Sequence, residues 1–252
     1  MTWIVAGNTF LGYCFAISDI MVSWGSQYQD ECLQKFYSVS DNIAVGFAGS
    51  VTLGFRMVED LKKFIEEQGK EKGKFPEFII EEWKRRAKFI FEHATQDEQK
   101  NQCHLIIMGT SSRKPIVMGQ DSFIKTYIYK LASPHFIPYY AKQNEVVTIG
   151  SGVKIDKYKE IFNWFNSGAN DLLRMHELGP NGMESFMSVV ISEQIVENPK
   201  FGISKFHHVV SISNTGITIR NNSTDMPKVA RGFDDFNFYC VNKGLKAAVA
   251  VT

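Results

Sequence analysis

The spacing of hydrophobic residues changes in blocks along this chain, and the order of the blocks restricts its fold more than any single motif does. Residues 3–18 and 34–49 carry the apolar, β-branched runs of strands, each interrupted by a turn, which predicts two hairpins. From Ser50 the apolar residues recur with helical spacing, and a second helix is predicted over 77–94. Two hairpins are therefore followed by a pair of helices.

The same order repeats in the second half of the chain. Five short runs rich in β-branched and aromatic residues lie between 103 and 150, and they predict a second sheet. Two more helices are expected over 154–165 and 182–197, and a hairpin over 207–221. Strands and helices that follow one another in groups are typical of an α+β fold with layered, mainly antiparallel sheets.

The chain has no repeat and no linker rich in Pro, Gly or Ser. We expect one domain over residues 1–220 and a C-terminal extension over 221–252. The extension carries Phe233, Phe236 and Phe238 and a closing "AAVAV" run, and such apolar groups stabilise little unless they cover a surface. The sequence leaves two arrangements open: the extension covers a neighbouring subunit, or it folds back over its own.

Charge and composition exclude several classes of protein. The 28 basic and 27 acidic residues leave a net charge of +1, which gives no electrostatic reason to expect a nucleic acid or an anionic membrane as partner. No apolar run approaches the ~20 residues of a membrane span, and the start lacks a signal-peptide pattern, so we expect a cytoplasmic protein. The four cysteines form no C-x-x-C pair, and adjacent strand residues His207 and His208 point to opposite faces. Neither a metal nor a cofactor is expected.

Thr2 follows the initiator methionine directly, and an apolar strand begins at once. If Met1 is removed, Thr2 offers a hydroxyl nucleophile together with an α-amine whose ordinary pKa of about 7.7–8.0 suits proton transfer near neutral pH. A threonine in second position also occurs without any catalytic role, so this feature needs support from the rest of the chain.

That support comes from four further motifs in a fixed order. "SD" ends the second predicted strand, "LQKF" opens the second hairpin, "GFAGS" runs into a helix, and "TIGSG" precedes another helix. In this order and spacing, residues 1–220 resemble the proteasome β-subunit family, including the HslV-type peptidases. The resemblance implies a four-layer α/β/β/α sandwich of the N-terminal-nucleophile hydrolase type and hydrolysis of peptide bonds by a terminal threonine.

The resemblance also assigns catalytic roles. Thr2 matches the nucleophile, Lys35 the lysine whose charge lowers the pKa of the hydroxyl, and Asp19 the carboxylate that orients this lysine. The backbone N–H of Gly49 matches the oxyanion donor, and Ser151 matches a serine that hydrogen-bonds near the threonine amine. These five residues form the predicted catalytic set.

Substrate and assembly are implied in the same way. Ser23 matches a residue of the substrate-binding loop, and four apolar pocket positions favour a hydrophobic residue before the cleaved bond; these positions are Val22, Leu33, Phe47 and Val51. The substrate would be a peptide or an unfolded protein, and the working form a homo-oligomeric ring or stack. Whether an ATPase unfoldase feeds the site is left open.

The chain departs from the family pattern at one late motif. Asn198 stands where the family has an aspartate and Phe201 where it has a serine, while Gly202 is retained. Some members of the wider family, such as the α-type ring subunits, keep the fold without catalysis. A catalytically silent protein that serves as an oligomeric scaffold or interaction module is therefore the alternative function.

Overall fold

The computed structural model describes residues 2–9, 12–113, 123–143, 145–154, 182–197 and 202–252. The strands are β1 (Ile4–Asn8), β2 (Cys14–Asp19), β3 (Met21–Trp24), β4 (Tyr28–Glu31), β5 (Phe36–Ser38), β6 (Ile43–Gly49), β7 (Cys103–Arg113), β8 (Phe123–Ala132), β9 (Tyr139–Tyr140), β10 (Val146–Ile149), β11 (His207–Ser213), β12 (Gly216–Asn221) and β13 (Ala250–Val251). The helices are α1 (Val51–Lys72), α2 (Pro76–Glu92), α3 (Gln96–Lys100), α6 (Gly182–Glu197) and α7 (Phe233–Asn242), with 3-10 turns η1 (Ser151–Lys154) and η2 (Ala247–Val249). None of these helices has the length and hydropathy needed to cross a bilayer.

The strands form three antiparallel sheets in the described part of the chain. Their orders are β10-β1-β2-β11-β12, β5-β6-β7-β8-β9 and β13-β3-β4. The hairpins expected at the start of the chain are present as β1–β2 and β5–β6, and the hairpin expected over 207–221 is β11–β12. The predicted mixture of helices with antiparallel sheets is therefore confirmed. The helix expected over 154–165 falls, beyond its first residue, outside the described residues.

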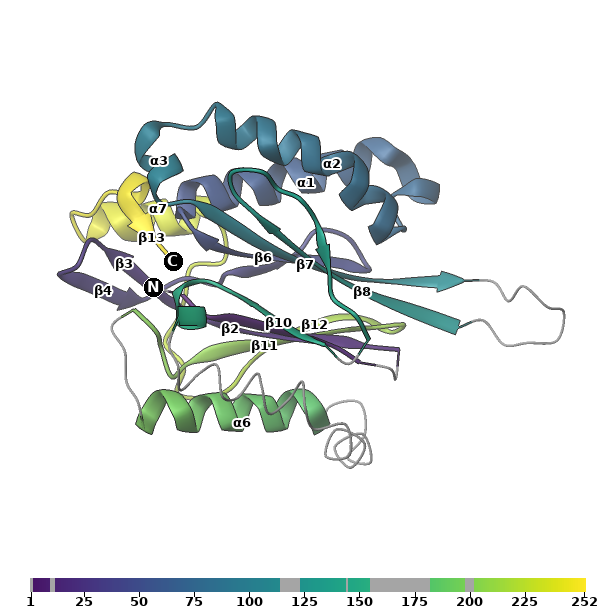
Figure 1. Cartoon of the computed structure of the whole chain (residues 1–252). Coiled ribbons are helices and arrows are strands. Elements are labelled where there is room, and N and C mark those ends of the chain that lie inside the picture. The colour runs from purple at the N-terminus through teal and green to yellow at the C-terminus, as the bar shows by residue number, and fades with distance from the viewer. Residues whose placement is uncertain (1, 10–11, 114–122, 144, 155–181, 198–201) are drawn as a thin grey trace, which may run out of the picture.

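The two larger sheets lie between helices. In Figure 1, α1 and α2 cover one face of the β5–β9 sheet, and α6 lies on the far side of the molecule against the sheet that contains β2 and β11. Three hydrophobic clusters fill the spaces between these elements. The first packs α1 and α2 on one sheet, the second lies between the two sheets, and the third packs α6 on the other sheet.

Alternation along the central strands explains their long apolar runs. In β7, Leu105 belongs to the cluster under α1 and α2, whereas the next residue, Ile106, belongs to the cluster between the sheets. In β1, Ile4 faces the other sheet and Val5 faces α6. Successive strand residues point to opposite faces, so a strand buried on both faces needs apolar residues at every position.

Residues 221–252, called the tail below, pack on the body of the same chain. Phe236 of α7 is fully buried in the cluster under α1, and its ring stacks on Trp24 with 5.9 Å between centroids. Phe233 contacts Phe55 of α1 edge to face at 5.6 Å. Of the two arrangements that the sequence leaves open, these residues adopt the one in which the tail folds back over its own subunit.

Candidate active site

Three of the predicted catalytic residues meet at the start of β1. Thr2 is fully buried, and its Oγ1 accepts a hydrogen bond of 2.9 Å from Nζ of Lys35. The same ammonium group forms an ion pair with Oδ1 of Asp19. Lys35 comes directly before β5, and its carbonyl accepts a hydrogen bond from the N–H of Phe47, which ties the lysine to the second sheet. Lys35 thus contacts both the hydroxyl of Thr2 and the carboxylate of Asp19.

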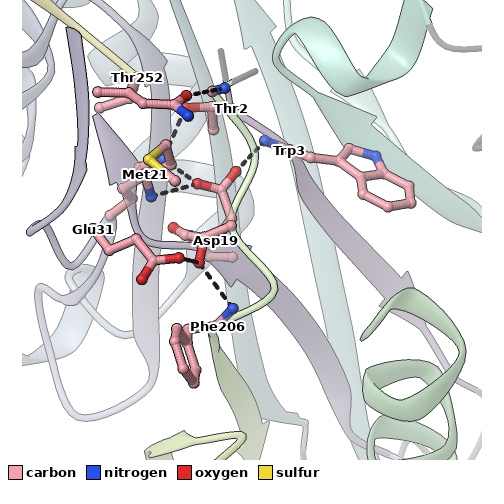
Figure 2. A network of polar contacts seen from close by, with 12 residues as sticks. Thr2, Trp3, Asp19, Met21, Glu31, Phe206 and Thr252 are labelled. Carbon is pink, nitrogen blue, oxygen red and sulfur yellow. Dashed lines mark hydrogen bonds and ion pairs between the residues drawn. The ribbon is translucent and has the colours of Figure 1, made fainter. Parts of the chain in front are cut away.

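Asp19 is held from several sides. The β1–β2 register places Ser18 opposite Ile4, so Asp19 at the end of β2 lies next to Trp3. Its Oδ2 accepts a 2.6 Å hydrogen bond from the N–H of Trp3, and its Oδ1 accepts one of 2.9 Å from the N–H of Met21. Figure 2 shows the Asp19 carboxylate between these partners, below Thr2. Charge-assisted bonds of this kind fix the orientation of the carboxylate that faces Lys35.

Burial determines the electrostatics of Lys35. The side chain is fully buried, and burial lowers the pKa of its ammonium group, while the charge of Asp19 opposes that change. A cation in contact with a hydroxyl stabilises its alkoxide form and lowers the pKa of that hydroxyl. The arrangement can therefore activate Thr2 Oγ1 for nucleophilic attack, provided that a base accepts the proton.

Ser151 holds Thr2 from the opposite side. The backbone nitrogen of Thr2 donates a 3.1 Å hydrogen bond to Oγ of Ser151, and the N–H of Gly152 donates one of 3.1 Å to the carbonyl of Thr2. Gly150 has a φ of +90°, and a Cβ there would lie 2.3 Å from the Thr2 carbonyl oxygen. Both features require glycine. The positioning role of Gly150 was not predicted, although "GSG" itself carried the signal.

Gly49, the predicted oxyanion donor, has a φ of +110°, and a Cβ there would lie 2.4 Å from the carbonyl oxygen of Gln102. Its N–H already donates to the carbonyl oxygen of Thr252 at 3.0 Å. Gly49 and Ser151 line one pocket of about 270 Å³. The other lining residues are Ala48, Asn101, Gln102, His104, Gly150, Val251 and Thr252. No motif predicted that Thr252 would line this pocket.

The predicted substrate-binding residues divide into two groups. Ser23 of β3 pairs with Val251 of the tail, close to this pocket. The four apolar positions are instead fully buried in the hydrophobic cluster that includes α7, and none of them lines the pocket; they are Val22, Leu33, Phe47 and Val51. The structure uses these four as core residues, and their contact with a substrate stays a prediction.

The departures at Asn198 and Phe201 lie outside the described residues. Gly202, which follows them, is described, has a φ of +81°, and donates its N–H to the side chain of Gln29. Gln29 in turn is paired with Ser23 across the β3–β4 hairpin. The retained glycine therefore connects this part of the chain to the strand that carries Ser23.

The two adjacent histidines lie on β11, which pairs with β2. Nε2 of His207 lies 2.7 Å from Oγ of Ser188 on α6. Burial lowers the pKa of both His207 and His208 to about 4, and the positive charges of Arg231 and Lys35 add to the effect at His208. Among the residues that the structure describes, no group of three or more His, Cys, Asp or Glu is placed to hold a metal ion.

No model of a known protein family matches this chain, and no curated protein matches it either. The resemblance to the proteasome β-subunit family therefore stays a prediction from the order of the sequence motifs.

Proposed function

We propose that this chain is a threonine-type peptidase of the N-terminal-nucleophile hydrolase class, similar to proteasome β subunits and HslV. One observation carries the proposal: the buried hydroxyl of Thr2 contacts a lysine that is paired with Asp19, while the nitrogen of Thr2 contacts Ser151. The order of helices, sheet, sheet and helix supports the four-layer α/β/β/α sandwich of that class.

The chemistry starts once removal of Met1 frees the amine of Thr2. The Thr2 hydroxyl attacks a peptide carbonyl, its proton passes through water to the amine, and the amine then protonates the leaving nitrogen as the C–N bond breaks. Lys35 lowers the pKa of the hydroxyl, Asp19 orients Lys35, and the N–H of Gly49 stabilises the oxyanion. Water finally hydrolyses the ester on Thr2 and restores the hydroxyl.

The proposed substrates are peptides or unfolded protein segments, and the proposed working form is a homo-oligomer in the cytoplasm. A closed ring or stack would keep folded proteins away from the nucleophile. On α7 of the tail, Phe238 and Val241 are 69% and 67% exposed, three residues apart on one helix face. An exposed apolar face of this kind is compatible with a subunit contact.

The test combines the intact mass of the purified protein with hydrolysis of short fluorogenic peptides. We expect loss of Met1, and we expect Thr2→Ala to abolish hydrolysis and, because it removes the buried hydrogen bond from Lys35, to cost about 1.5–3 kcal/mol of unfolding free energy. Thr2→Ser keeps a hydroxyl and should retain most of the stability and part of the activity. Thr110→Ala is the matched control, since Thr110 is a buried threonine of β7. Equal hydrolysis by wild type and Thr2→Ala would exclude Thr2 as the nucleophile.

The alternative function, a silent scaffold with this fold, is favoured by the contact between Gly49 and Thr252, which engages the oxyanion donor. A scaffold would retain Met1, show no hydrolysis, and fail to react with covalent inhibitors that target a terminal threonine. The same mass measurement and a labelling assay therefore separate the two functions.

A further inference from the structure

Residues 250–252 lie between two segments that the site already uses. On one side β13 pairs antiparallel with β3, with Ala250 opposite Trp24 and Val251 opposite Ser23. On the other side Val251 forms an antiparallel bridge with Ser50, at the start of α1. Figure 2 shows Thr252 next to Thr2. We call the space between β3 and residues 49–50 the strand slot.

Gly49 and Thr252 form a reciprocal pair of hydrogen bonds in this slot. The N–H of Gly49 donates to the Thr252 carbonyl at 3.0 Å, and the N–H of Thr252 donates to the Gly49 carbonyl at 2.8 Å. Oγ1 of Thr252 also accepts from the Gly49 N–H at 3.2 Å. Proteins bind extended peptides in the same way, by adding them as a strand through main-chain hydrogen bonds.

The anchor of the tail lies upstream of the slot. Nε1 of Trp24 donates to the carbonyl of Lys246 at 3.2 Å, and Phe236 of α7 is buried in the core. The part inside the slot is short, because β13 contains only Ala250 and Val251. Ala250 and Thr252 are buried, so the segment leaves only when another strand replaces its contacts, and the separate anchor lets it leave while α7 stays packed.

We propose that residues 250–252 are an inhibitory segment of the same chain, which rests in the strand slot where the proposed peptidase would take its peptide. An incoming peptide would pair with β3 around Ser23 and would place one carbonyl on the N–H of Gly49, where Thr252 now lies. The occupant indicates the ligand class: an extended peptide with small or β-branched side chains, as in Ala-Val-Thr. The catalytic consequence rests on the proposed peptidase function, whereas the binding itself does not.

The first experiment measures binding of a fluorescein-labelled peptide of residues 245–252, LKAAVAVT, by fluorescence anisotropy. A site that is free in only a fraction of the molecules has an apparent Kd raised by the inverse of that fraction. We expect deletion of residues 250–252 to tighten binding about tenfold or more relative to the intact chain. Val249→Ala, a change at an exposed position that leaves the slot filled, should bind as weakly as the intact chain.

A peptide with Val251→Pro is the matched ligand control, because proline removes a backbone N–H and is excluded from central strands. It should bind the deletion variant much more weakly than the parent peptide does. Equal affinity of LKAAVAVT for the intact and deleted chains, or no binding to a deleted chain with unchanged circular dichroism, would overturn the proposal.

A second experiment needs no variant and covers the case in which the deletion prevents folding. In the intact protein, the amides of Gly49 and Thr252 should exchange with solvent about 100-fold or more slowly than unprotected amides, because each is bonded to the other residue. Excess LKAAVAVT should lower the protection of Thr252 and keep that of Gly49. Rapid exchange at both amides, or protection that the peptide does not change, would contradict the proposal.

Hydrolysis separates this inference from the proposed function. If the chain binds the peptide but cleaves none, the proposed peptidase function is refuted and peptide binding in the strand slot still holds. If the chain hydrolyses peptides and deletion of residues 250–252 does not raise the rate about tenfold or more, the inhibitory role of this segment is refuted. The proposed peptidase function would then still hold.

Discussion

The polar and apolar sides of the candidate site differ in how they are built. On the polar side, the buried Lys35 contacts both Thr2 and the buried carboxylate of Asp19, and Ser151 lines a pocket. On the apolar side, the side chains that the family resemblance assigns to substrate binding are packed in the core beneath α7. The polar side has the form of a reaction centre, whereas the apolar side has the form of a closed interior.

This difference shows what each kind of contact needs. Buried charges are costly unless they are paired and hydrogen-bonded, so their partners must be placed accurately. Apolar residues need only be covered, and Phe236 and Phe233 of the tail pack on Trp24 and Phe55 of the cluster that contains them.

The largest expected loss of stability comes from breaking the buried ion pair between Lys35 and Asp19. Lys35→Met leaves the Asp19 carboxylate buried without its cation, which should cost about 3–5 kcal/mol of unfolding free energy and abolish hydrolysis. Urea denaturation at pH 7 measures the unfolding free energy, and a fluorogenic peptide assay measures hydrolysis. The double variant Lys35→Met with Asp19→Asn removes both charges and should recover most of the stability but no activity. A loss below about 1 kcal/mol in the single variant would show that the pair is not buried in solution.

Much of this polar side could be predicted from the sequence, because it depends on residues that recur in short motifs. "SD", "LQKF" and "GSG" each fix one side chain next to Thr2, and the neighbouring helices expected from Ser50 and over 77–94 are present as α1 and α2. The β3–β4 hairpin, α7 and β13 were not predicted. Their sequences have weak local periodicity, and β13 is a strand only because β3 and Ser50 pair with it across more than 200 residues.

The next effect tests whether the apolar side is core or pocket. Leu33→Ala should cost about 2–4 kcal/mol, because Leu33 is fully buried and its truncation leaves a cavity. Leu33→Met conserves volume and should cost less than about 1.5 kcal/mol. Denaturation of both variants provides the measurement. A small loss of stability for Leu33→Ala, combined with a changed preference among fluorogenic peptides, would show that the position faces substrate and not core.

A smaller effect is expected in the pH dependence of stability, which the buried His207 beside Asp19 on the paired strands should control. His207 has a pKa of about 4 in the folded chain and about 6.5 when unfolded, so the unfolded state binds more protons between these values, and stability falls as the pH drops through this range. Between pH 7 and 5 this histidine should cost about 2 kcal/mol. Glu184 acts in the opposite direction, since burial raises its pKa to about 7.

The comparison of wild type with His207→Gln isolates the histidine, because the contribution of Glu184 is present in both. Unfolding free energies at pH 7 and pH 5 should differ by about 2 kcal/mol less in the variant than in wild type. An equal pH dependence in the two proteins would mean that His207 is not held neutral in the folded state. Leu33→Ala, which changes only the apolar side, should leave the pH dependence as in wild type.

The smallest effect on stability is expected for a substitution of Ser151. The same substitution should lower hydrolysis strongly, so it separates stability from function. Ser151→Ala removes one hydrogen bond from the nitrogen of Thr2 at a position that borders the pocket, which should cost only about 0.5–1.5 kcal/mol. If the Thr2 amine is the base, it loses its fixed orientation when this contact is removed. Hydrolysis should then fall about tenfold or more, and the pH profile of the rate should shift. Ser38→Ala is the matched control, since Ser38 is an exposed serine of β5 with a single bond to a neighbouring carbonyl. Full activity and an unchanged pH profile in Ser151→Ala would mean that this serine only supports η1, and the polar side would then act through Lys35 and Asp19 alone.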